Sequence, residues 1–187
     1  MNTDLSNIII RQESAEDYEE IDTITRRAFG QSGELVAELV NLIRKSPNYI
    51  PALSLVAEKE KKIVGHIMLS HLNLDDNGTV RSVVTLSPIS VKPEEQKKGI
   101  GSSLIKTAIK KTDALGEPFI ILEGNPNYYS RFGFKPGKDF GISIAPPHWA
   151  PDAALILPLS KYNQAIKGKI IYPPYFNKVN DPSNVPQ

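Results

Sequence analysis

The feature that most constrains this chain is an apolar run that leads directly into a glycine-rich loop. Residues 83–91 read Val-Val-Thr-Leu-Ser-Pro-Ile-Ser-Val, and residues 96–101 read Gln-Lys-Lys-Gly-Ile-Gly. The β-branched residues predict a strand, and the apolar spacing after the loop predicts an amphipathic helix. A loop of this kind directs free backbone N–H groups and the positive end of the helix dipole to one point. The arrangement is typical of a site that holds a phosphate group.

Two familiar phosphate loops do not fit this stretch. A P-loop requires Gly-x-x-x-x-Gly-Lys-Ser/Thr, and this spacing does not occur in the chain. The dinucleotide fingerprint requires a third glycine three residues after Gly101, where the chain has Leu104. What remains to be explained is the pattern Gln96-x-x-Gly99-x-Gly101.

This pattern resembles the pyrophosphate-binding motif of the GCN5-related N-acetyltransferase (GNAT) family, which reads Arg/Gln-x-x-Gly-x-Gly/Ala. A second match lies downstream, where Tyr129 precedes Gly133-Phe134 as in the family's Tyr-x-x-x-Gly-Phe. The two motifs stand in the right order, at a distance that fits one helix and one strand. Further along the chain, residues 134–137, 153–159 and 168–176 resemble the C-terminal part of the bacterial YhbS-like subgroup of predicted acetyltransferases.

The resemblance implies the GNAT fold, an α/β (α+β) fold whose central sheet is mixed, mostly antiparallel and flanked by helices. In this fold the fourth and fifth strands, here 79–91 and 119–122, splay apart and leave a slot. Ser87-Pro88 fits such a departure, because proline cannot donate to a strand ladder. The expected elements are a strand over 8–12, helices over 14–29 and 34–45, strands over 54–58, 63–70 and 79–91, a helix after 99 and a strand over 119–122.

A single catalytic domain accounts for most of the chain, whose 187 residues suit one domain. We expect a GNAT acetyltransferase domain over residues 1–160 and a C-terminal extension over 161–187 that packs on or near it. The segment from Pro173 onward is rich in Pro and Asn, which predicts a surface-bound or partly frayed tail.

The composition excludes several classes of binding partner and of chemical site. The net charge of +1 gives no electrostatic reason to expect nucleic acid or an anionic membrane. The chain has no cysteine, which excludes disulfides, thiolate metal sites and a cysteine nucleophile. The N-terminus lacks the features of a signal peptide, so we expect a cytoplasmic protein. Family members often dimerise, so a homodimer is an open option.

The resemblance also implies that acetyl-CoA is the cosubstrate and that no metal takes part. In the family the pantetheine arm lies in the slot like an added strand, and a backbone N–H, here that of Ile89, polarises the thioester carbonyl. Main-chain amides of the glycine loop wrap the pyrophosphate, because a Cβ there would obstruct the phosphate. Asn125 and Asn127 are both open as the asparagine that contacts pantetheine. The expected cofactor-binding residues are Ile89, Ser90, Val91, Gln96, Lys97, Lys98, Gly99, Ile100, Gly101, Ser102 and Asn125.

Two side chains are candidates for the chemistry. Tyr129 matches the family position whose phenol donates a proton to the departing thiolate of coenzyme A. The alternative is that Tyr129 is an aromatic core residue of a short helix. Glu123, at the end of the strand over 119–122, is placed to reach the slot as a general base, and a capping or turn role is the equal alternative.

The function that follows is acetyl transfer from acetyl-CoA to a primary amine of a small-molecule or peptide acceptor, by direct attack in a ternary complex. The alternative is a non-catalytic acyl-CoA-binding sensor or regulatory module that uses the same slot. The two differ in whether a suitable amine accelerates the release of thiol.

The sequence carries no readable code for the acceptor. The loop around 29–34 and the segment 146–151 are expected to build its pocket. His66 and His71 fall on opposite faces of one strand, so we interpret them as packed or surface histidines and not as a metal pair. The acidic residues near the first helix are interpreted as solvated charges that complement the helix dipole. They are Glu13, Glu16, Asp17, Glu19 and Glu20.

Overall fold

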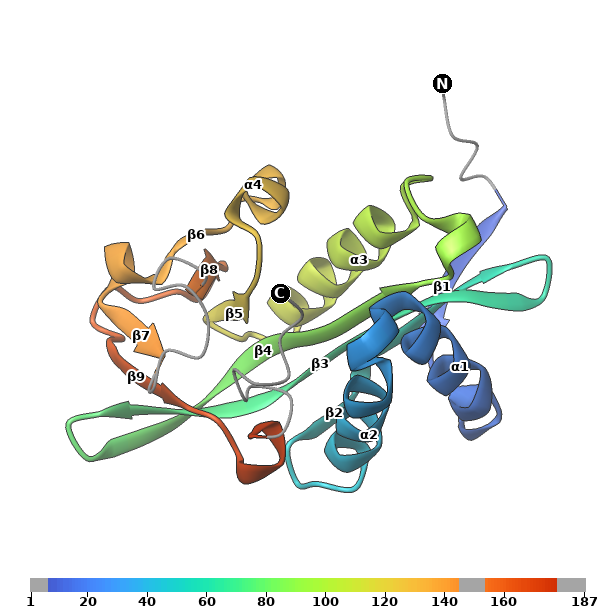
Figure 1. Cartoon of the computed structure of the whole chain (residues 1–187). Coiled ribbons are helices and arrows are strands. Elements are labelled where there is room, and N and C mark those ends of the chain that lie inside the picture. The colour runs from blue at the N-terminus through green and yellow to red at the C-terminus, as the bar shows by residue number, and fades with distance from the viewer. Residues whose placement is uncertain (1–6, 145–153, 178–187) are drawn as a thin grey trace.

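A mixed sheet forms the centre of the computed structural model, which describes residues 7–144 and 154–177 (Figure 1). The strands are β1 Ile8–Gln12, β2 Tyr49–Lys59, β3 Lys62–Asp76, β4 Thr79–Val91, β5 Phe119–Glu123, β6 Lys135–Pro136, β7 Ile142–Ile144, β8 Ala154–Pro158 and β9 Gly168–Ile171. The helices are α1 Tyr18–Phe29, α2 Gly33–Arg44, α3 Ile100–Ala114 and α4 Pro126–Tyr129. The strand order is β1-β2-β3-β4-β5-β8-β6, and β9 pairs with both β3 and β7. Of these pairs, β4–β5 and β7–β9 are parallel, which confirms the expected mixed, mostly antiparallel sheet.

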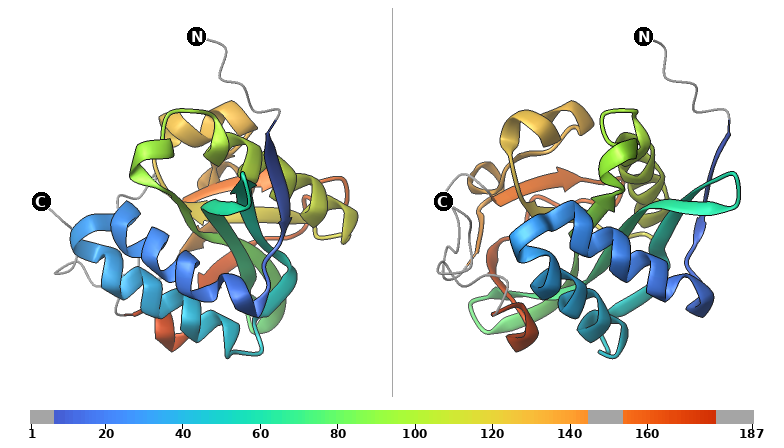
Figure 2. Two further views of the ribbon diagram at one scale, coloured as in Figure 1. Left: turned by 90° about the vertical axis from the view of Figure 1, so that its right-hand side faces the viewer. Right: turned by 45° about the vertical axis from the view of Figure 1, so that its right-hand side comes forward.

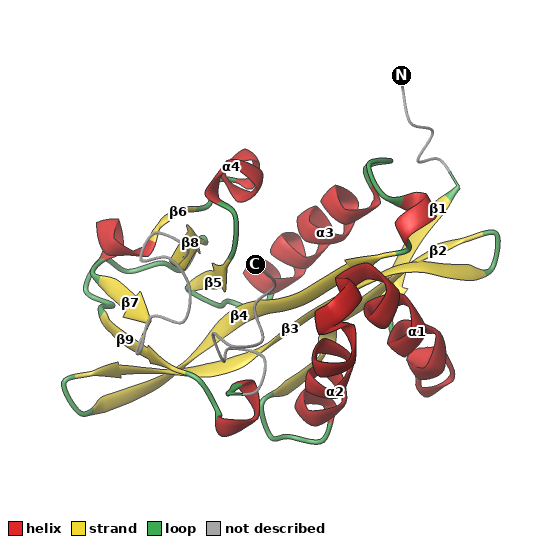
Figure 3. Ribbon diagram, in the orientation of Figure 1, coloured by secondary structure: helices red, strands yellow, loops and turns green. Residues whose placement is uncertain are grey.

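Helices cover both faces of the sheet (Figures 2 and 3). Helices α1 and α2 pack on one face through a cluster that includes Ile24, Leu39 and Met68. Helix α3 packs on the other face through a cluster that includes Leu104 and Ile105. Burial of both faces explains why several strands read as continuous apolar runs in the sequence.

Strand β5 shows how one run serves both layers. Phe119 and Ile121 belong to the cluster under α1 and α2, whereas Ile120 and Leu122 belong to the cluster under α3. Successive side chains of a strand point to opposite faces, so a wholly apolar strand suits a sheet that is covered twice. The helix α3 between β4 and β5 makes the expected crossover between parallel neighbours.

Strands β4 and β5 separate soon after they meet. Their parallel register joins Val84 to Ile120 and Thr85 to Ile121, and it includes no later residue of β4. Just beyond this point β4 places Ser87 and Pro88 opposite a single residue of β3, which is a bulge. The bulge and the early loss of pairing confirm the expected gap between the fourth and fifth strands.

Two strands are longer than expected, and the C-terminal segment is better anchored. Strand β2 begins at Tyr49, whereas the expected strand covered only 54–58, and β3 continues to Asp76, whereas the expected strand ended at 70. The C-terminal segment is not frayed at its start, because Phe176 is only 2 % exposed and joins the cluster under α1 and α2. Burial of the Phe176 ring in the core stabilises the position of this segment. The Pro-rich composition of the segment does not reveal this anchoring.

The interpretation of the acidic residues as solvated charges is wrong for Asp17, which is buried and pairs with Arg11 at 2.7 Å, and for Glu13. The Glu13 side chain is fully buried beside that of Arg44, with 2.8 Å between Oε2 and the Arg44 Nη2. The Tyr49 hydroxyl donates to it at 2.7 Å, and His66 Nε2 lies 3.1 Å away. Burial would raise the pKa of Glu13, but the hydrogen bonds from Arg44 and His66 outweigh it and hold the pKa below its ordinary value. Burial lowers the pKa of His66, so Arg44 is the main countercharge.

Glu13→Ala is expected to lower the free energy of unfolding by about 3–5 kcal/mol, because it leaves the buried Arg44 without its carboxylate. Urea denaturation would measure the change. Glu19→Ala, at an exposed position of α1, is the matched control and should stay within about 0.5 kcal/mol of the wild type. Equal effects of the two substitutions would contradict the assignment of Glu13 to a buried ion pair.

Candidate functional site

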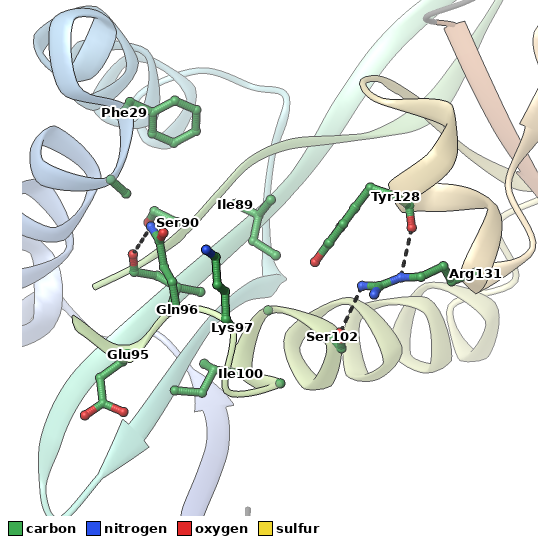
Figure 4. A pocket seen from close by; sticks show the side chains of 14 residues that line it. Phe29, Ile89, Ser90, Glu95, Gln96, Lys97, Ile100, Ser102, Tyr128 and Arg131 are labelled. Carbon is green, nitrogen blue, oxygen red and sulfur yellow. Dashed lines mark hydrogen bonds between the residues drawn. The ribbon is translucent and has the colours of Figure 1, made fainter. Parts of the chain in front are cut away.

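A cleft of about 750 Å³ lies between the start of α3, the end of β4, the end of α1 and the segment from Tyr128 to Arg131. Figure 4 shows the Lys97 side chain and the Tyr128 hydroxyl pointing into the space between these elements. The sequence-predicted residues that line it are Ile89, Ser90, Val91, Gln96, Lys97, Gly99, Ile100, Gly101 and Ser102. The structure therefore brings the strand end and the glycine loop together around one hollow.

The start of α3 presents backbone donors to this cleft. Gly99 has a φ of 86°, in the left-handed region that glycine adopts without a Cβ penalty. The first backbone bond of the helix runs from the Ser103 N–H to the Gly99 carbonyl at 3.0 Å. The N–H groups of the preceding residues, Ile100 to Ser102, therefore lie ahead of the helical ladder. The N-cap residue of α3 is Gly99, which has no side chain to cap this end, and the first turn of the helix carries no acidic residue.

Side chains hold the loop in place. The Gln96 side chain donates from Nε2 to the Val91 carbonyl at 3.1 Å, which ties the loop to the end of β4. Glu95 accepts from Lys59 at 3.2 Å and also pairs with Lys98 at 3.3 Å. The charge of Lys98 is thus matched within the loop, whereas Lys97 lines the cleft.

Arg131 is a cleft residue that sequence reasoning missed. Its Nη2 lies 3.4 Å from the Ser102 hydroxyl, and its Nε donates to the Tyr128 carbonyl at 3.1 Å (Figure 4). The guanidinium also lies over the Tyr128 ring, 4.4 Å from the centroid. Arg131 falls between Tyr129 and Gly133 of the second motif, so its position in that motif was the available signal. With Lys97 it gives the cleft two cationic side chains near the helix start.

A second, inner pocket of about 300 Å³ opens where β4 leaves β5. It contains both candidates for the chemistry, Glu123 and Tyr129, together with Thr85, Ser87 and Pro88 of β4. Phe29 and Ile89 line both hollows. The cleft and the inner pocket therefore adjoin at the bulged part of β4.

Tyr129 lies in a tight aromatic setting. Burial, followed by the neighbouring Tyr128, raises the pKa of the Tyr129 phenol to about 12, so it carries its proton at neutral pH. Its ring packs edge-on against Phe134 at 5.7 Å between centroids. A Cβ on Gly124 would lie only 2.6 Å from Cε2 of this ring, so the absence of a side chain at 124 makes room for Tyr129.

Glu123 is the last residue of β5, and its carboxylate has a partner from the C-terminal segment. Tyr172, just after β9, hydrogen-bonds through its phenol with both Glu123 and Thr85. Burial, with the adjacent Glu123 carboxylate, raises the pKa of Tyr172 well above its ordinary value. Tyr172 is far from Glu123 in the sequence and carries no motif, so sequence reasoning had no signal for it.

Comparison with known proteins decides the family. The family model described as the acetyltransferase (GNAT) domain matches residues 9–137. The chain belongs to the GNAT family of acetyltransferases. It is 36 % identical over 128 residues to the N-acetyltransferase YjhQ of Escherichia coli, covering 68 % of each chain. It is 26 % identical to the N-acetyltransferase YhbS of Escherichia coli over 91 % of this chain and 99 % of that one.

Solved GNAT structures share the fold over most of the length. A GNAT acetyltransferase from Brucella melitensis in complex with acetyl-CoA has a TM-score of 0.73 and 28 % identity, and covers 90 % of this chain and 97 % of its own. The YhbS structure from Escherichia coli in complex with CoA has a TM-score of 0.82 and 23 % identity, and covers 91 % and 92 %. The resemblance to this family and fold is thereby confirmed.

Some expected residues of this GNAT chain lie outside the cleft lining. The Asn125 side-chain oxygen accepts from the Asn127 N–H at 2.9 Å and so caps α4. His66 is buried beside Glu13, whereas His71 lies 3.4 Å from Glu117. The segment 146–151, expected at the acceptor pocket, lies outside the described residues.

Among residues 7–144 and 154–177, no group of three or more His, Asp or Glu side chains could hold a metal ion. In the same part of the chain, every helix falls short of the length and apolarity that a membrane span requires.

Gly124→Ala is expected to destabilise the GNAT fold by about 1–3 kcal/mol, because the new methyl overlaps the Tyr129 ring. In a Tyr129→Ala background the same substitution should be nearly neutral, so a double-mutant cycle would give a coupling of at least about 1 kcal/mol. Chemical denaturation of the four proteins measures it. Additive effects would show that Gly124 does not serve to accommodate Tyr129.

Proposed function

We propose that this chain transfers an acetyl group from acetyl-CoA to a primary amine of a small-molecule or peptide acceptor, by direct attack in a ternary complex. The single observation that carries the proposal is the meeting of two hollows at Ile89. One hollow is built for an anion by the start of α3, and the other holds Glu123 and Tyr129. A cosubstrate with a diphosphate at one end and a thioester at the other suits this arrangement.

The residues of the cleft fit the diphosphate of acetyl-CoA. The N–H groups of Ile100 to Ser102 lie ahead of the helical ladder, where an anion also meets the positive end of the α3 dipole. A Cβ on Gly101 would have Tyr128, Val91 and Ile89 as its neighbours, all of which line the cleft. Glycine at 101 therefore keeps this hollow open. Lys97 and Arg131 add charge that attracts a polyanion.

The gap in the sheet fits the pantetheine arm. Beyond Thr85 the register no longer joins β4 to β5, so an extended ligand could lie beside β4 as an added strand. In this position the backbone N–H of Ile89 would act as the donor that polarises the thioester carbonyl. The Brucella melitensis relative, which is in complex with acetyl-CoA, supports this assignment of the cosubstrate.

The transfer consumes one amine and one thioester. Glu123 takes a proton from the acceptor ammonium, directly or through water, and the freed nitrogen lone pair attacks the carbonyl carbon. A carbon–nitrogen bond forms, and the carbon–sulfur bond breaks with its electron pair on sulfur. The nitrogen then loses a second proton to water, and the sulfur takes one proton from water to leave as the thiol.

Tyr129 serves this step as a hydrogen-bond donor to the departing sulfur. Its pKa is about 12, whereas an ordinary thiol has a pKa of about 8.5. Complete transfer of the phenolic proton to the thiolate would therefore be uphill by about 5 kcal/mol, at about 1.36 kcal/mol per pKa unit. A hydrogen bond from the protonated phenol stabilises the developing negative charge without this cost.

The substitution Gly101→Ala is expected to weaken the binding of acetyl-CoA without lowering the stability of the fold. The methyl makes only ordinary contacts of 3.4 Å or more, and alanine favours a helix over glycine by up to about 1 kcal/mol. We expect the variant to be at least as stable as the wild type, while its dissociation constant for acetyl-CoA rises about tenfold or more. Calorimetric titration and urea denaturation measure the two quantities. Unchanged affinity would mean that the diphosphate lies elsewhere.

Tyr129→Phe is expected to lower kcat about 10–100-fold and leave acetyl-CoA affinity unchanged, because it removes one hydrogen bond to a charged sulfur. A thiol-release assay with an amine panel measures kcat, and Tyr162→Phe, outside both hollows, is the control. Because the phenol stays protonated below about pH 12, ionisation of Tyr129 should not lower the wild-type kcat at any pH below that value. Tight binding with no thiol release from any amine would instead support a sensor.

A further inference from the structure

The segment Tyr172–Phe176 forms a fixed wall of the inner pocket. Phe176 is buried and packs on the Tyr172 ring at 4.9 Å between centroids. Tyr175 ties the segment to the loop between α2 and β2, because its hydroxyl accepts from the Asn48 side chain at 2.8 Å. The side chains of the segment are thus held by core packing and by a hydrogen bond, so this wall of the pocket is formed before any acceptor enters.

The rest of the pocket is mainly apolar. Val36 and Leu39 of α2 are 4 % and 2 % exposed, and Leu86 of β4 is 5 % exposed. Phe29 and Pro88 complete these walls. These aliphatic and aromatic side chains carry no hydrogen-bonding atoms, so they favour an apolar body on the acceptor.

The described lining of the inner pocket contains one charged side chain, that of Glu123. Among the described residues that line the inner pocket, Glu123 is the only Asp, Glu, Lys or Arg. The Tyr172 phenol bonds to its carboxylate and also to Thr85, which fixes the carboxylate from the side of β9. An ammonium group that meets Glu123 is therefore oriented by the same contact that compensates its charge.

We propose that the inner pocket selects a small acceptor with a single amino group on an apolar body, and that Tyr172 is the residue that positions Glu123 for it. The inference rests on the proposed acetyl transfer and names its substrate class. The pocket's 300 Å³ lies at the small end of the range for ligand sites, which suits a compact amine.

A second ammonium group on the acceptor would be disfavoured. It would lie against side chains such as Leu39 and Phe176, where the described lining offers no second carboxylate. Burial of an ion without a partner costs several kcal/mol. Polyamines and aminoglycosides carry several such charges, so they fit this pocket poorly, whereas an alkylamine or arylalkylamine fits it well.

Hexylamine and hexamethylenediamine test this selectivity, because they share one carbon chain and differ in a second amino group. With the full-length chain and saturating acetyl-CoA, thiol release should give a kcat/KM for hexylamine at least about tenfold above that for the diamine. Equal or higher kcat/KM for the diamine would overturn the inference and leave acetyl transfer standing.

Tyr172→Phe tests the positioning role. The ring and its packing on Phe176 remain, so the variant should fold with a thermal midpoint lowered by at most about 5–10 °C, while kcat for hexylamine falls about tenfold because Glu123 loses its hydrogen bond. The KM for acetyl-CoA should not change. Tyr162→Phe is again the control, since it removes a hydroxyl outside the pocket.

The outcomes separate the two proposals. A fall in kcat with an unchanged KM for acetyl-CoA supports Tyr172 as a positioning residue, and an unchanged kcat overturns that role. If acetyl-CoA binds but neither amine releases thiol, while a broad panel of other amines also fails, then acetyl transfer itself is overturned and the selectivity falls with it.

Discussion

The structure depends on one interruption of its sheet. Strand β4 pairs with β5 at Val84 and Thr85 and then diverges, with a bulge at Ser87 and Pro88. An interior strand of a sheet normally forms backbone hydrogen bonds with a neighbour on each side. A strand that loses one neighbour inside the fold therefore has backbone N–H and C=O groups that are available to bind a ligand. In this chain the diverging half of β4 supplies residues to the outer cleft and to the inner pocket alike.

The two ends of this gap have opposite electrostatic character. At the outer end, the uncapped start of α3, Lys97 and Arg131 favour an anion. At the inner end, Glu123 favours a cation, and Tyr129 keeps its proton because burial raises its pKa to about 12. In the proposed acetyl transfer, a diphosphate thioester would occupy the outer end and an amine the inner end, and the two would meet near Ile89. The positions of the charges and the positions of the two hollows thus agree: the anion site lies at the outer end of the gap and the cation site at the inner end.

Local patterns predicted the individual strands and helices, and the resemblance of two motifs to the GNAT family predicted the fold and most of the residues that line the cleft. The glycine loop, the apolar runs and the Tyr129 motif each lie within a short stretch, and backbone preference and apolar spacing act over such distances. The rest depends on contacts between distant segments. Glu13 looks like a solvated acid in the sequence but lies buried against Arg44, and Tyr172 reaches Glu123 only because β9 joins the sheet. The sequence does not reveal these pairs, because the identity of an acidic residue does not show whether its carboxylate is exposed to water or buried.

The central claim is that one ligand runs from the start of α3 to the bulge of β4. Amide chemical shifts of isotope-labelled protein, followed by nuclear magnetic resonance during titration with acetyl-CoA, test it most directly. The account predicts that the amides of Ile89, Gly99, Gly101 and Ser102 shift together and saturate at one equivalent of ligand. If those amides stay unchanged while others shift, or if nothing shifts with acetyl-CoA in large excess, the account is contradicted.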